Sequence, residues 1–234
     1  MFKTTIAAML LAACGSAIAQ DVETILRKAD NHRLREGSSQ LETLVQTYKD
    51  GKLDKEKRYQ VLIRPGGKSL VLFRSPGETG QKVLMSGDDF WMLLPGSARP
   101  IRITPLQKLL GDASTGDITN MTWSGDYHGS ITREVEINGV PCLELELAAT
   151  RKSLSYQRLV LHVAKADYRP VHADLYASSN KRLKQARFSQ DRMVLVDEIQ
   201  TGRETVITIL SSKPRQFGDE LFNPMFLSRS DAAP

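Results

Sequence analysis

The feature of this sequence that most restricts its fold is a long succession of short runs with period-two alternation. The first run is LETLVQTY at 41–48, and an Asp-Gly turn separates it from a second run at 57–64. An Asp-Gly pair between two alternating runs is typical of a β-hairpin. Further runs follow at hairpin spacing, at 69–73, 82–86, 90–94, 100–104, 130–137, 142–148, 156–164, 170–177, 183–189, 193–200 and 204–210. Turn residues separate these runs, so we predict an antiparallel meander of about eleven strands.

One helix is predicted before the first strand. Asp21 can cap it, since aspartate side chains accept hydrogen bonds from the first free backbone N–H groups of a helix. Apolar residues then recur at helical spacing, at Val22, Ile25, Leu26 and Ala29. We expect this helix to lie with one face on apolar surface.

A second, short helix is predicted within the strand-rich part of the chain. The segment TPLQKLLG at 104–111 has a threonine N-cap, a proline at the first helical position and a glycine stop. Its apolar residues Leu106, Leu109 and Leu110 follow helical spacing and would have to be buried against the sheet. We therefore expect a plug or lid here, with the loop at 112–120 supplying any motion.

The runs differ in how many of their two faces are apolar. Both faces are apolar at 69–73 and 90–94, whereas 133–137 and 144–147 alternate with charged residues. The early strands are therefore expected to be covered on both sides and the later ones on one side. Helices over one face of a curved sheet would produce this pattern, and a sheet too large for its helices tends to enclose a cavity. The predicted class is mainly β (α+β), an open half-barrel.

The N-terminus can be processed in two ways. Lys3 and the apolar run at 4–13 form a secretory signal, because that run is too short to span a bilayer. The stretch LLAACGSAIAQ at 10–20 offers cleavage after Ala19, which releases a soluble periplasmic chain, or lipidation of Cys14, which anchors it to a membrane. Lipidation would leave a signal of only 13 residues, so signal length favours a signal peptide at 1–19.

Composition and motifs point away from nucleic acids and catalysis. The 32 Lys and Arg residues and 27 Asp and Glu residues are interspersed, which does not predict a nucleic-acid surface. After cleavage at Ala19 only Cys142 remains, so no internal disulfide is expected. The four histidines lack metal-ligand spacing, and 65–69 lacks the first glycine of a phosphate-binding loop. No serine-nucleophile motif is present either. We therefore predict no catalytic residues, no metal and no cofactor.

The segment SLVLFRSPGETGQKVLMSGDDFWMLLPGSARPIRITPLQKLLG at 69–111 resembles the LolA-like outer-membrane lipoprotein-sorting proteins. Shared features are a strand ending in Phe-x-x-Pro, a Trp strand ending in Leu-Pro, and an Arg-x-x-Arg-Ile stretch before Thr-Pro. Four other segments look similar to the family, at 29–33, 138–149, 167–176 and 218–227. The resemblance implies one half-barrel domain over 20–234, closed by short lid helices over an apolar cavity.

The resemblance also implies a class of ligand and a set of partners. The resemblance implies a carrier for acyl chains of lipoproteins or other lipids, with an inner-membrane exporter and an outer-membrane acceptor as partners. The same fold also serves as a sensor or as an accessory subunit of a lipid exporter, and this alternative stays open. The residues expected to line the cavity are Leu72, Leu84, Trp91, Leu93, Leu106 and Leu110.

Two departures from the family pattern concern the lid. Relatives tend to have a Gly-Ser-Asp-Phe stretch where this chain has residues 111–118 without an aromatic residue, so cargo preference or the closing contact can differ. The best understood carrier holds its closed state with an arginine near the lid. Arg99 and Arg102 are the nearest candidates for that residue, and a solvated strand face is the alternative role for each.

Overall fold

The structure is a computed structural model, and it describes residues 21–33, 37–104, 108–110, 113–114, 117 and 122–229. Thirteen strands form one antiparallel sheet, in the order β6-β5-β4-β3-β2-β1-β15-β14-β13-β12-β11-β10-β9. Each of the thirteen overlaps one of the runs predicted from alternation, although about eleven strands were expected. The strands of the sheet are β1 (Ser39–Lys49), β2 (Lys52–Arg64), β3 (Lys68–Phe73), β4 (Lys82–Ser86), β5 (Asp89–Leu93), β6 (Ile101–Ile103), β9 (Tyr127–Ile137), β10 (Val140–Ala149), β11 (Arg158–Ala164), β12 (Pro170–Tyr176), β13 (Arg182–Ser189), β14 (Arg192–Asp197) and β15 (Arg203–Pro214).

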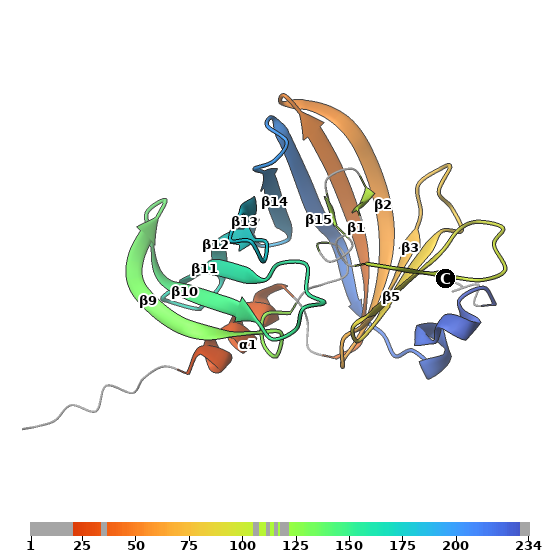
Figure 1. Cartoon of the computed structure of the whole chain (residues 1–234), viewed down its shortest axis with the longest axis horizontal. Coiled ribbons are helices and arrows are strands. Elements are labelled where there is room, and N and C mark those ends of the chain that lie inside the picture. The colour runs from red at the N-terminus through yellow and green to blue at the C-terminus, as the bar shows by residue number, and fades with distance from the viewer. Residues whose placement is uncertain are drawn as a thin grey trace, which may run out of the picture.

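The sheet is strongly curved and does not close into a barrel. Strand β1 pairs with both β2 and β15, so the first and last strands of the sheet in sequence lie side by side at its centre. The two edge strands are β6 and β9, and Figure 1 shows β9 and β5 at opposite ends of the curved sheet. The expected class, a mainly β open half-barrel, is confirmed.

One α-helix covers part of the concave face. Helix α1 (Val22–Arg33) packs near β9, where Figure 1 shows it beneath the β9–β11 end of the sheet. The Asp21 carboxylate accepts a hydrogen bond from the backbone N of Glu23 at 3.2 Å, as predicted for the cap. Ile25, Leu26 and Ala29 are buried in the large concave core with the inward residues of the strands. The N-terminal helix and its apolar face are confirmed.

The early strands are covered on both faces, also as predicted. In β3, Val71 and Phe73 belong to the concave core, whereas Leu70 and Leu72 belong to a second cluster on the convex face. That cluster is covered by the C-terminal segment, which contains the 3-10 helices η1 (Asp219–Phe222) and η2 (Pro224–Phe226). Figure 1 shows this blue segment outside β3 and β5. The convex face is thus covered by a mostly irregular segment. Its sequence has no helical or strand periodicity from which this cover could be predicted.

The prediction of a short helix at 104–111 is wrong for residues 108–110. Residues Lys108–Leu110 form strand β7, which pairs with β8 (Ala113–Ser114) in a separate two-stranded sheet. A helix of this length has few backbone hydrogen bonds to offset its nucleation cost, and two adjacent leucines suit a strand equally well. Residues 105–107 and 111–112 lie outside the described part of the chain.

Candidate functional site on the concave face

A hollow on the concave face has an apolar floor contributed by β1 and β15 and by the neighbouring strands β14 and β13. We call it the inner hollow, and its volume is about 60 Å³. Leu41 comes from β1, and Ile207 and Ile209 come from β15, with their side chains on the inward side of the alternation. The lining residues are Arg33, Leu41, Thr43, Asp117, Phe188, Ser189, Gln190, Asp191, Arg192, Met193, Ile207 and Ile209.

A smaller hollow adjoins the inner hollow beneath the end of helix α1. We call it the indole hollow because Trp123 borders it, and its volume is about 10 Å³. The two hollows share four lining residues, so they are continuous parts of one depression. The indole hollow is lined by Arg33, Asp117, Trp123, Leu175, Ala186, Phe188, Met193 and Leu195.

Two aromatic rings and one guanidinium group lie at the border between the two hollows. The Trp123 and Phe188 rings meet edge to face, with centroids 5.6 Å apart and planes at 85°. The Arg33 guanidinium lies 4.6 Å from the Trp123 ring centroid and 5.5 Å from that of Phe188. Cation–π contact of this kind is strongest where water is excluded. The end of α1 is thereby tied to β13 through aromatic side chains.

Charges around the hollows occur in compensating sets. The Asp117 carboxylate accepts a hydrogen bond from the Tyr156 hydroxyl at 2.7 Å and another from Lys184 Nζ at 2.6 Å. The side chains of Asp117 and Lys184 are only 2% and 8% exposed. A buried ion pair is tolerated when hydrogen bonds satisfy its remaining polar atoms, and the Tyr156 hydroxyl supplies one here.

Asp30 is the second buried carboxylate of this region. It accepts hydrogen bonds from the backbone N of Trp123 at 2.9 Å, the backbone N of Ser124 at 2.9 Å and the Ser124 hydroxyl at 2.6 Å. Burial raises the pKa of Asp30, and these hydrogen bonds oppose that rise. Burial likewise lowers the pKa of Arg33, whereas the charges of Asp30 and Asp117 oppose the change.

Four of the residues predicted to line a cavity do lie together. Leu72, Leu84, Trp91 and Leu93 occupy one face of β3, β4 and β5, with Leu84 opposite Trp91 in the register. They pack with Phe222 and Leu227 of the C-terminal segment, on the convex face rather than at the inner hollow. Leu106 lies outside the described residues, and Leu110 is in β7 with its side chain outside the description. Their role in binding stays a prediction.

The residues that border the hollows escaped the sequence prediction for identifiable reasons. Asp30 gave a usable signal, because a carboxylate four residues after Leu26 falls on the apolar stripe of the helix. Asp117 belongs to a segment without periodicity, and nothing local indicates its pairing with Lys184. Arg33 lies beside the concave core, whereas Arg99 and Arg102 are both exposed and Arg102 pairs with Asp89.

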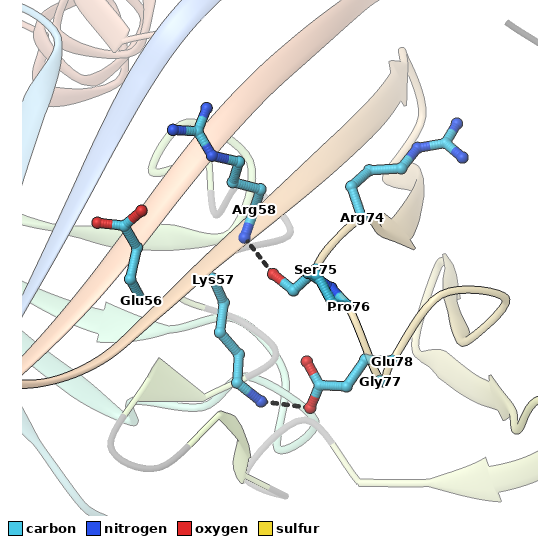
Figure 2. Close-up of a pocket in the computed structure, with 8 residues that line it drawn as sticks. All are labelled: Glu56, Lys57, Arg58, Arg74, Ser75, Pro76, Gly77 and Glu78. Atoms are coloured by element: carbon cyan, nitrogen blue, oxygen red, sulfur yellow. Dashed lines mark hydrogen bonds and ion pairs between the residues drawn. The ribbon is translucent and has the colours of Figure 1, made fainter.

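A larger hollow lies at the surface between β2 and the loop that follows β3. Its volume is about 460 Å³, and Figure 2 shows the charged residues around it. Lys57 forms an ion pair with Glu78, and the backbone N of Arg58 donates to the Ser75 hydroxyl at 2.8 Å. In Figure 2 the guanidinium groups of Arg58 and Arg74 point in different directions, away from each other. Because these cations do not converge, the hollow is not built to hold an anion.

Two searches of the described residues bear on other kinds of site. No group of three His, Cys, Asp or Glu side chains among them could hold a metal ion. None of the described helices is long and apolar enough to cross a membrane.

The open sheet, its apolar concave face and the helix lying over it define a LolA-like binding fold. A solved LolA superfamily protein from Nitrosomonas europaea is 31% identical, with a TM-score of 0.80, over 86% of this chain and 96% of that one. A family model described as an uncharacterized protein matches residues 66–229. This chain belongs to the LolA superfamily.

Two further solved structures have the same fold at lower identity. A DUF1329 family protein from Desulfovibrio piger is 22% identical with a TM-score of 0.74, over 88% of this chain and 97% of that one. An outer membrane lipoprotein-sorting protein domain from Vibrio parahaemolyticus is 22% identical with a TM-score of 0.72, over 88% of this chain and 98% of that one. No curated protein sequence matches the chain significantly.

Proposed function

We propose that this protein is a periplasmic carrier that binds the acyl chains of lipoproteins or another lipid on its concave face and delivers them to the outer membrane. The observation that carries this proposal is the inner hollow, a depression with an apolar floor at the centre of an open sheet. Each methylene group moved from water into such a depression contributes about 0.8 kcal/mol. The superfamily membership and the lipoprotein-sorting relative support the same reading.

Binding of a whole acyl chain requires the concave face to open further. The inner hollow, at about 60 Å³, holds only a short apolar group. One of its lining side chains, Met193, is half-buried, so it can turn away without rebuilding the core. The unbranched side chain of Met193 suits it to repack against a ligand. We expect affinity to increase with chain length until the widened depression is filled.

The proposed location rests on the N-terminus, where residues 1–20 lie outside the described part of the chain. Cleavage after Ala19 would give a free periplasmic chain, and lipidation of Cys14 would give an anchored one. Mass spectrometry of the mature protein distinguishes an N-terminal Gln20 from a lipidated Cys14. A free N-terminus at Gln20 is the expected result, because a shuttle has to leave the inner membrane.

Two adjacent residues of β15 provide the test of binding. Ile209 lines the inner hollow, whereas Leu210 is 47% exposed and comes next in the strand alternation. Ile209→Glu should weaken binding of a fluorescent acyl probe at least about tenfold, because a carboxylate in an apolar depression is strongly unfavourable. Leu210→Glu is the matched control and should bind like the wild type.

Two results would count against the carrier. One is a wild-type protein that neither binds acyl probes nor carries lipid when purified from a periplasmic extract. The other is a stable complex with a single inner-membrane protein after crosslinking in cells, with no bound lipid, which would favour the sensor or accessory role. A carrier should give transient contacts with its cargo and with an outer-membrane acceptor.

A further inference from the structure

The Trp123 indole is a buried hydrogen-bond donor without an acceptor among the described residues. Trp123 is 1% exposed, and its Nε1–H has no hydrogen-bond partner within the described part of the chain. Buried indole N–H groups usually have a partner, so one without an acceptor is unfavourable for folding alone. A donor kept in this state at the border of a hollow is a common property of ligand sites.

The ring is held so that its N–H has a fixed position. The backbone N of Trp123 donates to Asp30, Arg33 lies over the ring face, and the Phe188 ring meets it edge to face. Because contacts from both α1 and β13 restrain Trp123, its ring cannot turn to find an acceptor elsewhere. A donor fixed in this way binds an acceptor with little loss of conformational entropy.

The hollow that Trp123 helps to line is small. The indole hollow, at about 10 Å³, has room for a single oxygen atom or one water molecule. It continues into the inner hollow, whose far side is formed by Leu41, Ile207 and Ile209. A ligand that places an oxygen near Trp123 would therefore lay its apolar chain along β1 and β15.

The charges nearby favour an uncharged acceptor. Arg33 and Lys184 are balanced by Asp30 and Asp117. A free carboxylate would add a negative charge without a counterion in a mostly buried setting, which is costly. The carbonyl oxygen of an ester or amide accepts the same hydrogen bond without adding charge.

We propose that the Trp123 indole N–H binds the carbonyl oxygen of an ester- or amide-linked acyl chain, so that this site selects acyl chains over plain alkyl chains. The proposal rests on the proposed function, since it names the chemical class of lipid that the concave face takes. It assigns Trp123 a role in ligand selection in addition to its place in the lining of the indole hollow.

The test compares ligands that differ only in the carbonyl group. Binding of methyl dodecanoate, methyl dodecyl ether and dodecanoate is measured by calorimetry on the full chain. The wild type should bind the ester about fivefold more tightly than the ether, as expected for one hydrogen bond, and should bind dodecanoate less tightly than the ester. In Trp123→Phe, which keeps an aromatic ring but removes the N–H, the ratio of ester affinity to ether affinity should fall about fivefold, so that this preference is lost.

The second tryptophan of the chain is the matched control. Trp91 is on the convex face, so Trp91→Phe should keep the full preference for the ester. If Trp123→Phe fails to fold, the indole N–H resonances of the wild type replace it, since only two tryptophans are present. The ester should shift the Trp123 resonance, and the ether should not.

The outcomes separate this inference from the proposed function. Equal affinity of the wild type for ester and ether would overturn the inference and leave the carrier intact, with a water molecule alone bound at Trp123. A preference that persists in Trp123→Phe would overturn it as well. Tighter binding of dodecanoate than of the ester would assign the site to a carboxylate instead. Failure of the wild type to bind any of the three ligands would overturn both proposals.

Discussion

Both faces of strands β3 to β5 carry apolar side chains, but the two faces are covered differently. On the convex face, Leu70, Leu72 and Leu84 are closed off by Phe222 and Leu227 of the same chain. On the concave face, the core that contains Val71 and Val83 extends to an open depression near β15. Apolar alternation therefore shows that a face is covered, and it does not show whether the protein or a ligand covers it.

The largest effect is expected from breaking a charge pair on the concave side. Lys184→Met would remove the cation that donates to the buried Asp117 carboxylate, so we expect a loss of about 4 kcal/mol in the free energy of unfolding. Urea denaturation measures the loss. The double variant Asp117→Asn with Lys184→Met should recover more than half of it, because neither charge then remains buried. A double variant as unstable as the single one would show that packing, not charge, holds this region.

The C-terminal segment should matter almost as much for stability, but not for ligand binding. Phe222 is 4% exposed beneath the convex cover, so Phe222→Ala should lower the free energy of unfolding by about 3 kcal/mol. Its acyl affinity should be unchanged wherever the protein is folded. Phe226 is 41% exposed, and Phe226→Ala should cost less than about 0.5 kcal/mol. A loss of acyl binding in Phe222→Ala would make the convex cluster part of the binding site.

This comparison also explains how far the sequence could be used. The alternation located the strands of the sheet, and the apolar stripe of Val22, Ile25 and Leu26 located helix α1, because both signals are local and periodic. Alternation also placed Leu72, Leu84 and Trp91 on one face. It could not tell which face was concave, because sheet curvature and the path of residues 215–229 depend on contacts between distant segments.

The candidate site was harder to predict than the fold for the same reason. Trp123 and the Phe188–Met193 pair of the β13–β14 hairpin come from separate parts of the chain and meet only in the folded sheet. No spacing rule connects them. The short helix expected at 104–111 shows the opposite error. The local sequence contains residues typical of helix caps, but the pairing of β7 with β8 outweighs them.

A polar cluster on the convex side predicts a response to acid. The pKa of Glu144 is lowered from 4.5 to about 2, first by its hydrogen bond from Arg133 and further by those from Thr132 and His162. A carboxylate with a lowered pKa stabilises the fold above its unfolded pKa and loses that contribution as the pH falls towards 2. Glu144→Gln should lose roughly 1–2 kcal/mol at neutral pH.

The shape of the pH profile distinguishes this role from simple packing. Between pH 4.5 and pH 2 the stability of Glu144→Gln should fall less steeply than that of the wild type, because one titrating group has been removed. Thermal unfolding over this range measures the two slopes. Parallel profiles would mean that the Arg133 pair contributes little in solution.

The smallest predicted effects involve the same substitution on the two sides of the sheet, with opposite signs. The Thr205 hydroxyl is buried on the concave side without a hydrogen-bond partner among the described residues, and the residue is 1% exposed. Thr205→Val removes that polar atom and keeps the branched shape, so it should stabilise the protein by about 1 kcal/mol. Thr132 is exposed and donates to Glu144 Oε1 at 2.7 Å, so Thr132→Val should destabilise it by about 0.5 kcal/mol. If Thr205→Val is destabilising instead, its hydroxyl has a partner in solution, and the apolar character assigned to the concave face near β15 would have to be reduced.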